Sequence, residues 1–374
     1  MRLERLPICC ILPPHILNKL AESPEHRERA FRTLAISEKL RGRREVFAQM
    51  AIALPAGQKR RTIYDAQQKT NLPGNLVRGE GVPVSNDPGV NEAYDFSGAT
   101  YDFYKEAYNR NSLDDQGMRL DSTVHYGQEY DNAFWDGRQM VYGDGDSRLF
   151  QRFTICLDVV AHELTHGLTS QTAKLLYTGQ PGALNESISD VFGSLVKQRA
   201  LAQTADKADW LIGAGLFTAA VSGVALRSMK DPGTAYDDPA LGKDPQPGHM
   251  SGYQDLGSDV DHGGVHINSG IPNRAFFLTA AAIGGNAWEK AGLIWYTALK
   301  ERLQPNSDFQ AAADATFAVA RDLFGENSSE QRAVRDGWSG VGITVGAAAV
   351  AAGAPKPPAA ATGRARGTGR AATS

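Results

Sequence analysis

The residues best suited to chemistry stand close together near the middle of the chain. His162 and His166 are four residues apart, and Glu163 directly follows the first histidine. On an α-helix, residues i and i+4 share a face, so both imidazoles can reach one metal ion. Glu163 then projects beside them, where its carboxylate can accept a proton from a metal-activated water. The same five-residue pattern also occurs on solvated helix faces without a metal, so it needs support from other residues.

A candidate for the third ligand lies further along the chain. Nineteen residues separate His166 from Glu186, which belongs to a second predicted helix. Two histidines and one glutamate are a known ligand set for catalytic zinc, and they leave a fourth position open. Asp190 lies one helical turn after Glu186 and can accept the second ring N–H of a ligand histidine. We expect one zinc ion on His162, His166 and Glu186, with Asn185 and Asp190 supporting these ligands.

The sequence around these helices divides into two kinds of pattern. From Thr62 to about Phe153 it is turn-rich and strand-like, with predicted strands at 122–126 and 139–142 and a helix beginning at Tyr101. After Phe153 helical periodicity dominates. The predicted helices cover residues 154–169, 185–201, 268–283, 287–303 and 308–323. This order predicts an α+β protein with a β-rich lobe, an α-helical lobe and the zinc site in the cleft between them.

The beginning of the chain differs in charge from the rest. Residues 1–61 carry 13 Lys or Arg against 6 Asp or Glu, which leaves 26 basic and 36 acidic residues for the remainder. A basic head on an acidic body favours an intramolecular partnership. The stretch Ala53–Arg61 is rich in small, Pro/Gly and basic residues, as exposed connectors are, and we expect cut sites between about Phe47 and Arg60.

We therefore predict four segments. They are a pro-segment at 1–55, a β-rich catalytic lobe that ends in the zinc helix at 56–168, an α-helical catalytic lobe at 169–347 and a disordered tail at 348–374. The tail is predicted from its composition, because Ala, Gly, Pro and Thr with only basic charges cannot build a core.

Further motifs occur in the order found in thermolysin-like zinc metallopeptidases. They are Asn-Ala-Phe-Trp at 132–135, Met-Val-Tyr-Gly-Asp-Gly at 140–145, the zinc helix, Gly-Ala-Leu-Asn-Glu at 182–186, Leu-Arg-Ser-Met at 226–229 and Gly-Gly-Val-His-Ile-Asn-Ser-Gly at 263–270. The sequence resembles this family from about Thr62 to about Ile343. Its short head with Pro13-Pro14 resembles the pro-segment of the protealysin branch. The resemblance implies a two-lobed neutral endopeptidase that is made as a precursor.

The resemblance also implies how negative charge is stabilised during the reaction. His266 and Tyr177 match groups that donate to the oxygen of the tetrahedral intermediate, where each placed donor is worth about 3 kcal/mol. Asp261 matches the carboxylate that orients and charges His266. The competing interpretations are a histidine satisfied within the core and a tyrosine that only packs.

Substrate binding is likewise implied by the resemblance. Asn132 and the backbone of Ala133 match groups that hold an extended peptide at a strand edge, and Arg227 matches the donor to a substrate carbonyl. A structural ion pair is the competing interpretation of Arg227. The family's specificity pocket would be lined by Phe150, Phe153, Val159, Ile212, Leu216 and Leu226. An apolar lining favours cleavage on the amino side of apolar residues.

Calcium is where the sequence departs from the family's calcium-rich members. Asp158 and Asp209 keep an acid, but Lys197, Leu211 and Ala214 stand where the pattern has Glu. Two carboxylates are too few for an ion that usually takes six to eight oxygens. The ammonium of Lys197 can instead pair with Asp158 or Asp209, unless it points to solvent. We expect zinc as the only strongly bound metal, with calcium weak or absent.

Composition and the N-terminal sequence limit which binding partners and which cellular location we expect. A net charge of −3 gives no indication of nucleic acid binding, and no stretch approaches the ~20 apolar residues of a membrane span. The apolar run from Leu6 to Leu17 is broken by prolines, so no classical signal peptide is recognisable. We expect a cytoplasmic precursor, with export by a non-classical route left open. Its partners would be protein or peptide substrates and its own pro-segment.

Two questions stay open at this point. Cys9 or Cys10 could ligate zinc in the precursor, since thiolates are good zinc ligands, or both could pack as small apolar residues, which we favour. The chain could also be a non-catalytic zinc-bound peptide-binding module, or an amidase or esterase on a non-peptide substrate. An intact Glu163 argues against the first of these, and the residues that hold an extended peptide argue against the second.

Overall fold

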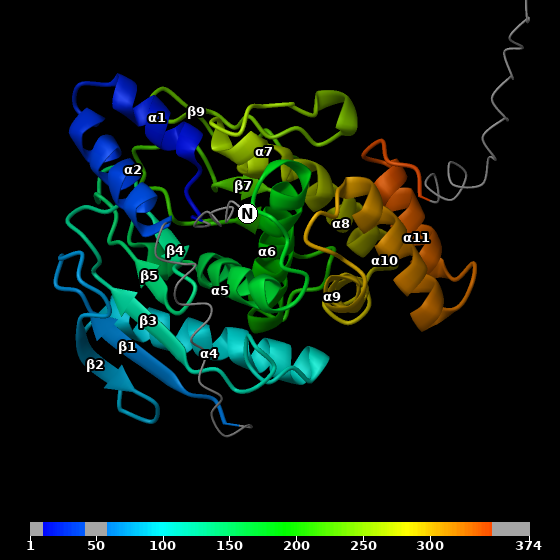
Figure 1. Cartoon of the computed structure of the whole chain (residues 1–374), viewed down its shortest axis with the longest axis horizontal. Helices are drawn as coiled ribbons and strands as arrows, with labels where there is room; N and C mark the ends of the chain where they lie inside the picture. The colour runs from blue at the N-terminus through cyan, green and yellow to red at the C-terminus, as the bar shows by residue number, and fades with distance from the viewer. Residues whose placement is uncertain (1–9, 42–57, 346–374) are drawn as a thin grey trace, which may run out of the picture.

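The computed structural model describes residues 10–41 and 58–345, whose elements are arranged as in Figure 1. Cys9, most of the expected connector and the expected tail lie outside the described residues. Two helices, α1 (Pro14–Glu22) and α2 (Arg27–Arg41), form the head of the described chain. The rest is a sheet-containing part followed by a helical part, so the predicted two-lobed α+β arrangement is confirmed.

A five-stranded sheet with the strand order β2-β1-β3-β5-β4 forms the framework of the first part. Its strands are β1 (Arg61–Asp65), β2 (Asn75–Gly79), β3 (Leu120–Val124), β4 (Ala133–Trp135) and β5 (Met140–Tyr142). The pairs β1–β3 and β3–β5 are parallel, whereas β4 runs antiparallel to β5 and ends the sheet. The outer edge of β4 can therefore accept an additional extended chain.

Helices are the main regular elements of the remainder. They are α4 (Pro88–Tyr108), α5 (Leu157–Gln171), α6 (Gly179–Ala200), α7 (Asp261–Asn268), α8 (Gly270–Ile283), α9 (Ala291–Glu301), α10 (Phe309–Phe324) and α11 (Ser329–Ser339). Short strands β6 (Leu211–Ile212) and β7 (Arg227–Ser228) pair with each other, as do β8 (Asp237–Asp238) and β9 (Gly242–Lys243). Single 3-10 turns η1 (Phe153–Ile155) and η2 (Met250–Gly252) complete the described elements.

The helices α5 and α6 pack against each other at the centre of the molecule, where the sheet meets the helical part (Figure 1). Gly193 permits this close packing, because a Cβ atom there would lie 2.6 Å from the carbonyl oxygen of Asp158. A side chain at this position would push the helices apart, and α6 would no longer present its first half to the histidines of α5. One glycine thus supports the geometry of the whole centre.

The head lies over β4 and β5, as Figure 1 shows in blue, and its apolar residues are buried. Ile11, Leu12, Ile16, Leu17 and Leu20 are at most 2% exposed and belong to the same hydrophobic cluster as the catalytic helices. A segment that buries this much apolar surface is a docked structural element, since each such side chain contributes roughly 1.5–3 kcal/mol.

The observed helices differ from the predicted ones mainly at their beginnings. The helix expected from Tyr101 begins thirteen residues earlier, at Pro88, where Asp87 caps it by accepting hydrogen bonds from the N–H groups of Gly89 and Val90. A proline at the first helical position and an aspartate before it are a start signal that the prediction missed. The helix expected from residue 185 begins at Gly179, and α7 and α11 were not predicted at all.

Candidate metal centre and active site

Helices α5 and α6 bring the three predicted metal ligands together. The Nε2 atoms of His162 and His166 lie 3.0 Å apart. The carboxylate of Glu186 lies 3.5 Å from the first of these nitrogens and 3.4 Å from the second. All three side chains are fully buried, and their donor atoms lie within 4.8 Å of one another. Among the described residues, no other group of His, Cys, Asp and Glu has this geometry.

The neighbours of the two histidines determine which nitrogen faces the centre. The Nδ1 atom of His162 lies 2.8 Å from Asp190 Oδ1, and the Nδ1 atom of His166 lies 2.9 Å from Asn185 Oδ1. Because both partners are acceptors, each ring carries its proton on Nδ1. Two Nε2 lone pairs then face each other beside a carboxylate, an arrangement that repels itself without a cation. The donor set fits zinc, with one coordination position open.

Asp190 is itself held by residues from two other elements. Arg227 donates two hydrogen bonds of 2.8 Å to its carboxylate, and the side-chain amide of Asn273 donates another. Burial alone would raise the pKa of Asp190, but the charge of Arg227 and the hydrogen bond to His162 outweigh it and lower the pKa. The carboxylate therefore stays charged and can support the histidine.

Glu163 lies on α5 with its carboxylate directed toward the edge strand. Its Oε2 atom accepts a hydrogen bond of 3.1 Å from the backbone N–H of Trp135 on β4, and the side chain is fully buried. This bond fixes the carboxylate between the metal ligands and the strand. A base in that position faces any peptide that lies along β4.

His266 and Tyr177 form a second group of donors beside Glu186. The tyrosine hydroxyl donates to a Glu186 oxygen and lies 3.2 Å from His266 Nε2, while His266 Nδ1 lies 2.6 Å from Asp261 Oδ1. Burial lowers the pKa of His266, but Glu186 and Asp261 outweigh burial and raise it. Positive φ angles at Gly263 and Gly264 let the chain turn between Asp261 and the helix that carries His266.

The predicted peptide-binding residues hold the chain's own head. The carbonyl of Ala133 accepts from the N–H of Ile11 at 3.2 Å, and Asn132 Oδ1 accepts from the N–H of Leu12 at 3.0 Å. Arg227 donates to the carbonyl of Ile11 at 3.1 Å. The head thus occupies the position where the sequence places substrate, so the site as described is blocked.

The predicted pocket residues are all buried within the hydrophobic core. Phe150, Phe153, Val159, Ile212, Leu216 and Leu226 are at most 1% exposed and share a hydrophobic cluster with Ile11. Their common burial agrees with an apolar pocket but also with ordinary core packing.

The expected ion pair behind the zinc helix is present. Lys197 Nζ lies 2.8 Å from Asp158 Oδ2 and 2.9 Å from Asp209 Oδ1, and it donates to the carbonyl of Leu211 at 2.6 Å. Lys197 therefore does not point to solvent. Its ammonium lies between the two carboxylates that the sequence retains.

The side chain of Cys10 is buried and is not grouped with the three possible metal ligands. It belongs to a small buried cluster with Ala66, Tyr126, Tyr130, Phe134 and Val141. This placement agrees with the packing interpretation for Cys10, whose backbone carbonyl oxygen lies 2.9 Å from His266 Nε2. Cys9 lies outside the described residues.

Several functional contacts were missed by the sequence analysis. Arg29 of α2 pairs with Asp131 and Asp146 at 2.7 Å each, and all three side chains are buried. Ser189 lies 3.0 Å from His166 Nδ1, and Asn273 supports Asp190 as described. Buried carboxylates require a partner, but the burial of Asp131 and Asp146 is apparent only in the fold, so no signal in the sequence indicated Arg29.

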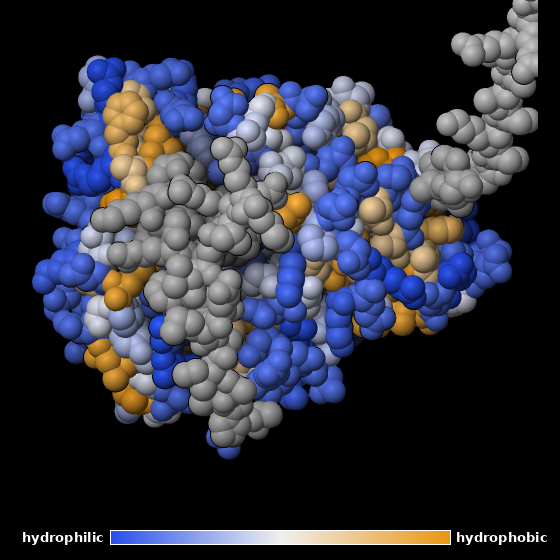
Figure 2. All heavy atoms as spheres, viewed as in Figure 1, coloured by the Kyte–Doolittle hydropathy of each residue, from blue (hydrophilic) through white to orange (hydrophobic). Residues whose placement is uncertain are grey.

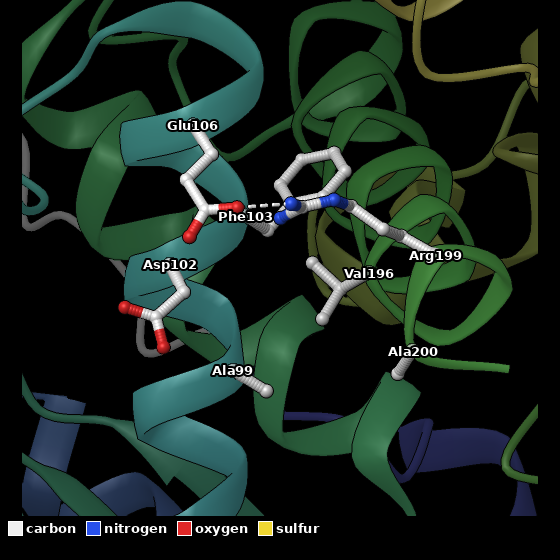
Figure 3. Close-up of a pocket in the computed structure, with 7 residues that line it drawn as sticks. All are labelled: Ala99, Asp102, Phe103, Glu106, Val196, Arg199 and Ala200. Atoms are coloured by element: carbon white, nitrogen blue, oxygen red, sulfur yellow. Dashed lines mark hydrogen bonds and ion pairs between the residues drawn. The ribbon is translucent and has the colours of Figure 1, made fainter. Parts of the chain in front are cut away.

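A separate surface pocket lies between α4 and α6. Figure 3 shows its lining, which includes the ion pair of Arg199 with Glu106. Val196, another lining residue, follows Glu186 by ten residues, which corresponds to about 15 Å along a helix. This pocket is distinct from the metal centre.

Fold and site together define a two-lobed metallopeptidase, and comparisons with known proteins agree. The profile of the thermolysin metallopeptidase catalytic domain matches residues 53–170, and that of the thermolysin metallopeptidase alpha-helical domain matches residues 173–343. The chain belongs to the thermolysin family of metallopeptidases. It is a zinc endopeptidase of this family, made with an N-terminal pro-segment.

Three relatives illustrate the similarity. An "Extracellular metalloprotease" from Pectobacterium carotovorum subsp. carotovorum is 52% identical over 91% of this chain and 97% of that protein. "Protease PrtS" from a Photorhabdus species is 55% identical over 76% of each chain. The structure of the protealysin precursor from Serratia proteamaculans superposes with a TM-score of 0.82 at 50% identity, covering 90% of this chain and all of that one. The resemblance to the protealysin branch is thereby confirmed, and the non-catalytic alternative is not favoured.

The expected location was wrong. We expected a cytoplasmic precursor because no classical signal peptide is recognisable, but a relative of nearly the same length is named an extracellular metalloprotease. The similarity therefore points to a secreted protein. Among the described helices, none has both the length and the apolar character needed to span a membrane. The face in Figure 2 is largely hydrophilic, with apolar residues in small patches.

Proposed function

We propose that this protein hydrolyses extended peptides at a single zinc ion held by His162, His166 and Glu186, with Glu163 as the general base. The observation that supports it most strongly is the pair of Nε2 atoms at 3.0 Å beside a buried carboxylate. Zinc, when bound, supplies a Lewis acid that polarises the substrate carbonyl and makes water nucleophilic near neutral pH. The two ligand histidines are kept in the required tautomer by Asp190 and Asn185, as proposed from the sequence.

The remaining residues have separate tasks in this proposal. Glu163 takes a proton from the attacking water and passes it to the leaving nitrogen, which lies toward β4. His266, charged and oriented by Asp261, and Tyr177 donate to the oxygen on which negative charge develops. Removal of one such donor typically costs about 2.7–4 kcal/mol.

Substrate would lie along the edge of β4 in place of the head. Asn132 and the carbonyl of Ala133 would accept from its N–H groups, and Arg227 would donate to a carbonyl. We propose that the residue after the scissile bond enters the buried apolar pocket and is therefore apolar. Ile11 supports this, because it is fully buried between the same binding groups.

We further propose that calcium plays no structural part behind the zinc helix, because Lys197 already neutralises Asp158 and Asp209. The segment boundaries near residues 55, 168 and 347 also stay proposals. The second of these falls within α5, which continues to Gln171.

Casein hydrolysis by the activated enzyme tests the proposal. Activity should disappear with a zinc chelator and return when zinc is added. A library of peptides should be cut before apolar residues. Chelator-resistant hydrolysis would contradict the role of the metal, and cleavage before charged residues at equal rates would contradict the pocket.

A further inference from the structure

The first described residues of the chain lie along β4 in one fixed register. Cys10 forms an antiparallel bridge with Phe134, and the N–H of Ile11 donates to the carbonyl of Ala133 at 3.2 Å. Asn132 accepts from Leu12, and Arg227 donates to the carbonyl of Ile11. Every polar group proposed to hold substrate therefore holds this segment.

The register places one particular carbonyl at the reactive centre. The carbonyl oxygen of Cys10 lies 2.9 Å from His266 Nε2, and the hydroxyl of Tyr177 lies 3.2 Å from the same nitrogen. These are the two donors proposed for the oxygen that becomes negative. The next carbonyl, that of Ile11, is bound by Arg227 instead. Within the described part of the head, the Cys10–Ile11 bond thus has the position of a bond to be broken.

The residue after this bond and the position of the general base also agree with those proposed for a substrate. Ile11, which follows the bond, is fully buried in the apolar cluster, as the proposed preference requires. Glu163 is fixed toward the same strand through the N–H of Trp135, the residue directly after Phe134. The base and the donors therefore lie beside the peptide bond that the register selects.

We propose that the enzyme hydrolyses the Cys10–Ile11 bond within its own precursor and that residues from Ile11 onward remain docked after the cut. The inference rests on the proposed catalytic residues. Water adds its oxygen to the carbonyl carbon of Cys10, and the C–N bond breaks. The leaving nitrogen of Ile11 receives the proton that Glu163 carries. The products are a carboxylate on Cys10 and an amino group on Ile11.

The contacts beyond the bond explain why this cut would not activate the enzyme. Ile16, Leu17 and Leu20 of α1 are at most 2% exposed, and Arg29 of α2 pairs with two buried aspartates. These anchors all belong to the fragment that begins at Ile11. The fragment stays bound as a product in the site, and activation still requires a second cut in the connector.

The test is intact-mass and N-terminal analysis of the zinc-loaded, full-length precursor during incubation at several protein concentrations. A new N-terminus at Ile11 should form with a rate constant that does not depend on protein concentration, while casein hydrolysis does not rise. Glu163→Ala should abolish the cut. Ile11→Gly should slow it at least tenfold, because one missing methylene in an apolar pocket changes rates by roughly 10- to 200-fold.

Ile16→Ala is the matched control, because Ile16 is equally buried but does not flank the bond. This substitution should weaken the docking of the head, but cleavage at Cys10–Ile11 should still occur. The proposal is wrong if the chain ahead of Ile11 stays attached in a precursor whose activated form hydrolyses casein. It is equally wrong if the cut accelerates with protein concentration. Failure of the activated enzyme to hydrolyse casein would instead overturn the proposed function.

Discussion

Two clusters of acids and bases lie between the same pair of helices, and they obtain their positive charge differently. At the metal centre, two imidazoles and Glu186 converge with lone pairs directed at a common point. One helical turn earlier on α5, Asp158 faces Lys197, whose ammonium lies between it and Asp209. The first cluster needs an ion from solution, and the second carries its own cation as a side chain.

The metal centre is suited to catalysis, whereas the Lys197 cluster is suited to supporting the fold. A metal ion offers an open coordination position and a strong Lewis acid, which an ammonium group cannot provide. A lysine offers permanence, because it cannot be removed by a chelator or diluted away. We propose that, of these two clusters, the reactive one depends on an external ion and the supporting one does not.

Removal of the carboxylate ligand should have the largest effect. Glu186→Ala deletes one of three zinc ligands, so zinc affinity should fall by more than the roughly 10- to 100-fold typical of a residue that only supports a ligand. Peptide hydrolysis by the activated enzyme should fall with it. Zinc stoichiometry by elemental analysis checks the result, and Glu330→Ala, which removes a carboxylate from α11, is the control. Full zinc content in Glu186→Ala would contradict the assignment.

Removal of the internal cation should affect stability instead of chemistry. Lys197→Met leaves Asp158, whose side chain is 2% exposed, without its partner, and the free energy of unfolding should fall by about 3–5 kcal/mol. Lys207→Met, at a side chain that is 75% exposed, should change it by less than about 0.5 kcal/mol. Denaturant unfolding measures both variants.

The charge reversal Lys197→Glu sharpens the comparison. It places three carboxylates together and should create a requirement for calcium, with stabilisation of about 2.7 kcal/mol at a calcium concentration 100 times the dissociation constant. The wild-type protein should respond little to millimolar calcium. A large rise in the wild-type melting temperature with calcium would show that Lys197 does not replace the ion.

A third positive charge that pairs with buried acids is that of Arg29, which belongs to the removable head. Arg29→Ala leaves Asp131 and Asp146 buried without their partner, so the docked head should be weakened by about 2 kcal/mol or more, roughly 30-fold in the docking equilibrium. The precursor should hydrolyse casein before any cut in the connector. Arg32→Ala, which removes an exposed pair with Glu28, is the control. Equal latency of the two variants would argue against Arg29 as an anchor.

The smallest effect is expected at His125, whose positive charge depends on pH. His125 lies between Asp144 and Asp87, at 2.9 and 2.7 Å, and these hydrogen bonds raise its pKa from 6.5 to about 9. Because the pKa is raised in the folded state, its stabilisation is complete below pH 6.5 and is lost as the pH rises through 9. The loss should be about 1–2 kcal/mol, since the ring is partly exposed. In His125→Asn the free energy of unfolding should change little between pH 6.5 and 9. A wild-type free energy of unfolding that is also constant over this range would contradict the assignment.

The features that could be predicted from the sequence are those that depend on the spacing of nearby residues. Two histidines four apart on a helix and Glu186 with Asp190 one turn later need only helical geometry, and both sets lie where expected. Lys197 was predicted from the loss of acids around Asp158. By contrast, the register of Cys10 and Ile11 on β4 depends on contacts over more than a hundred residues, which no local pattern encodes. The partners of Arg29 were missed for the same reason.

The most direct test of the central claim compares zinc content with turnover in Glu163→Ala. Each activated protein is analysed for bound zinc and for the rate of hydrolysis of one peptide with an apolar residue after the cut. The account predicts one zinc per chain in both proteins, and a variant rate lower by about 10²–10⁴-fold, the usual contribution of a general base. Hydrolysis by zinc-loaded Glu163→Ala at the wild-type rate would contradict the mechanism.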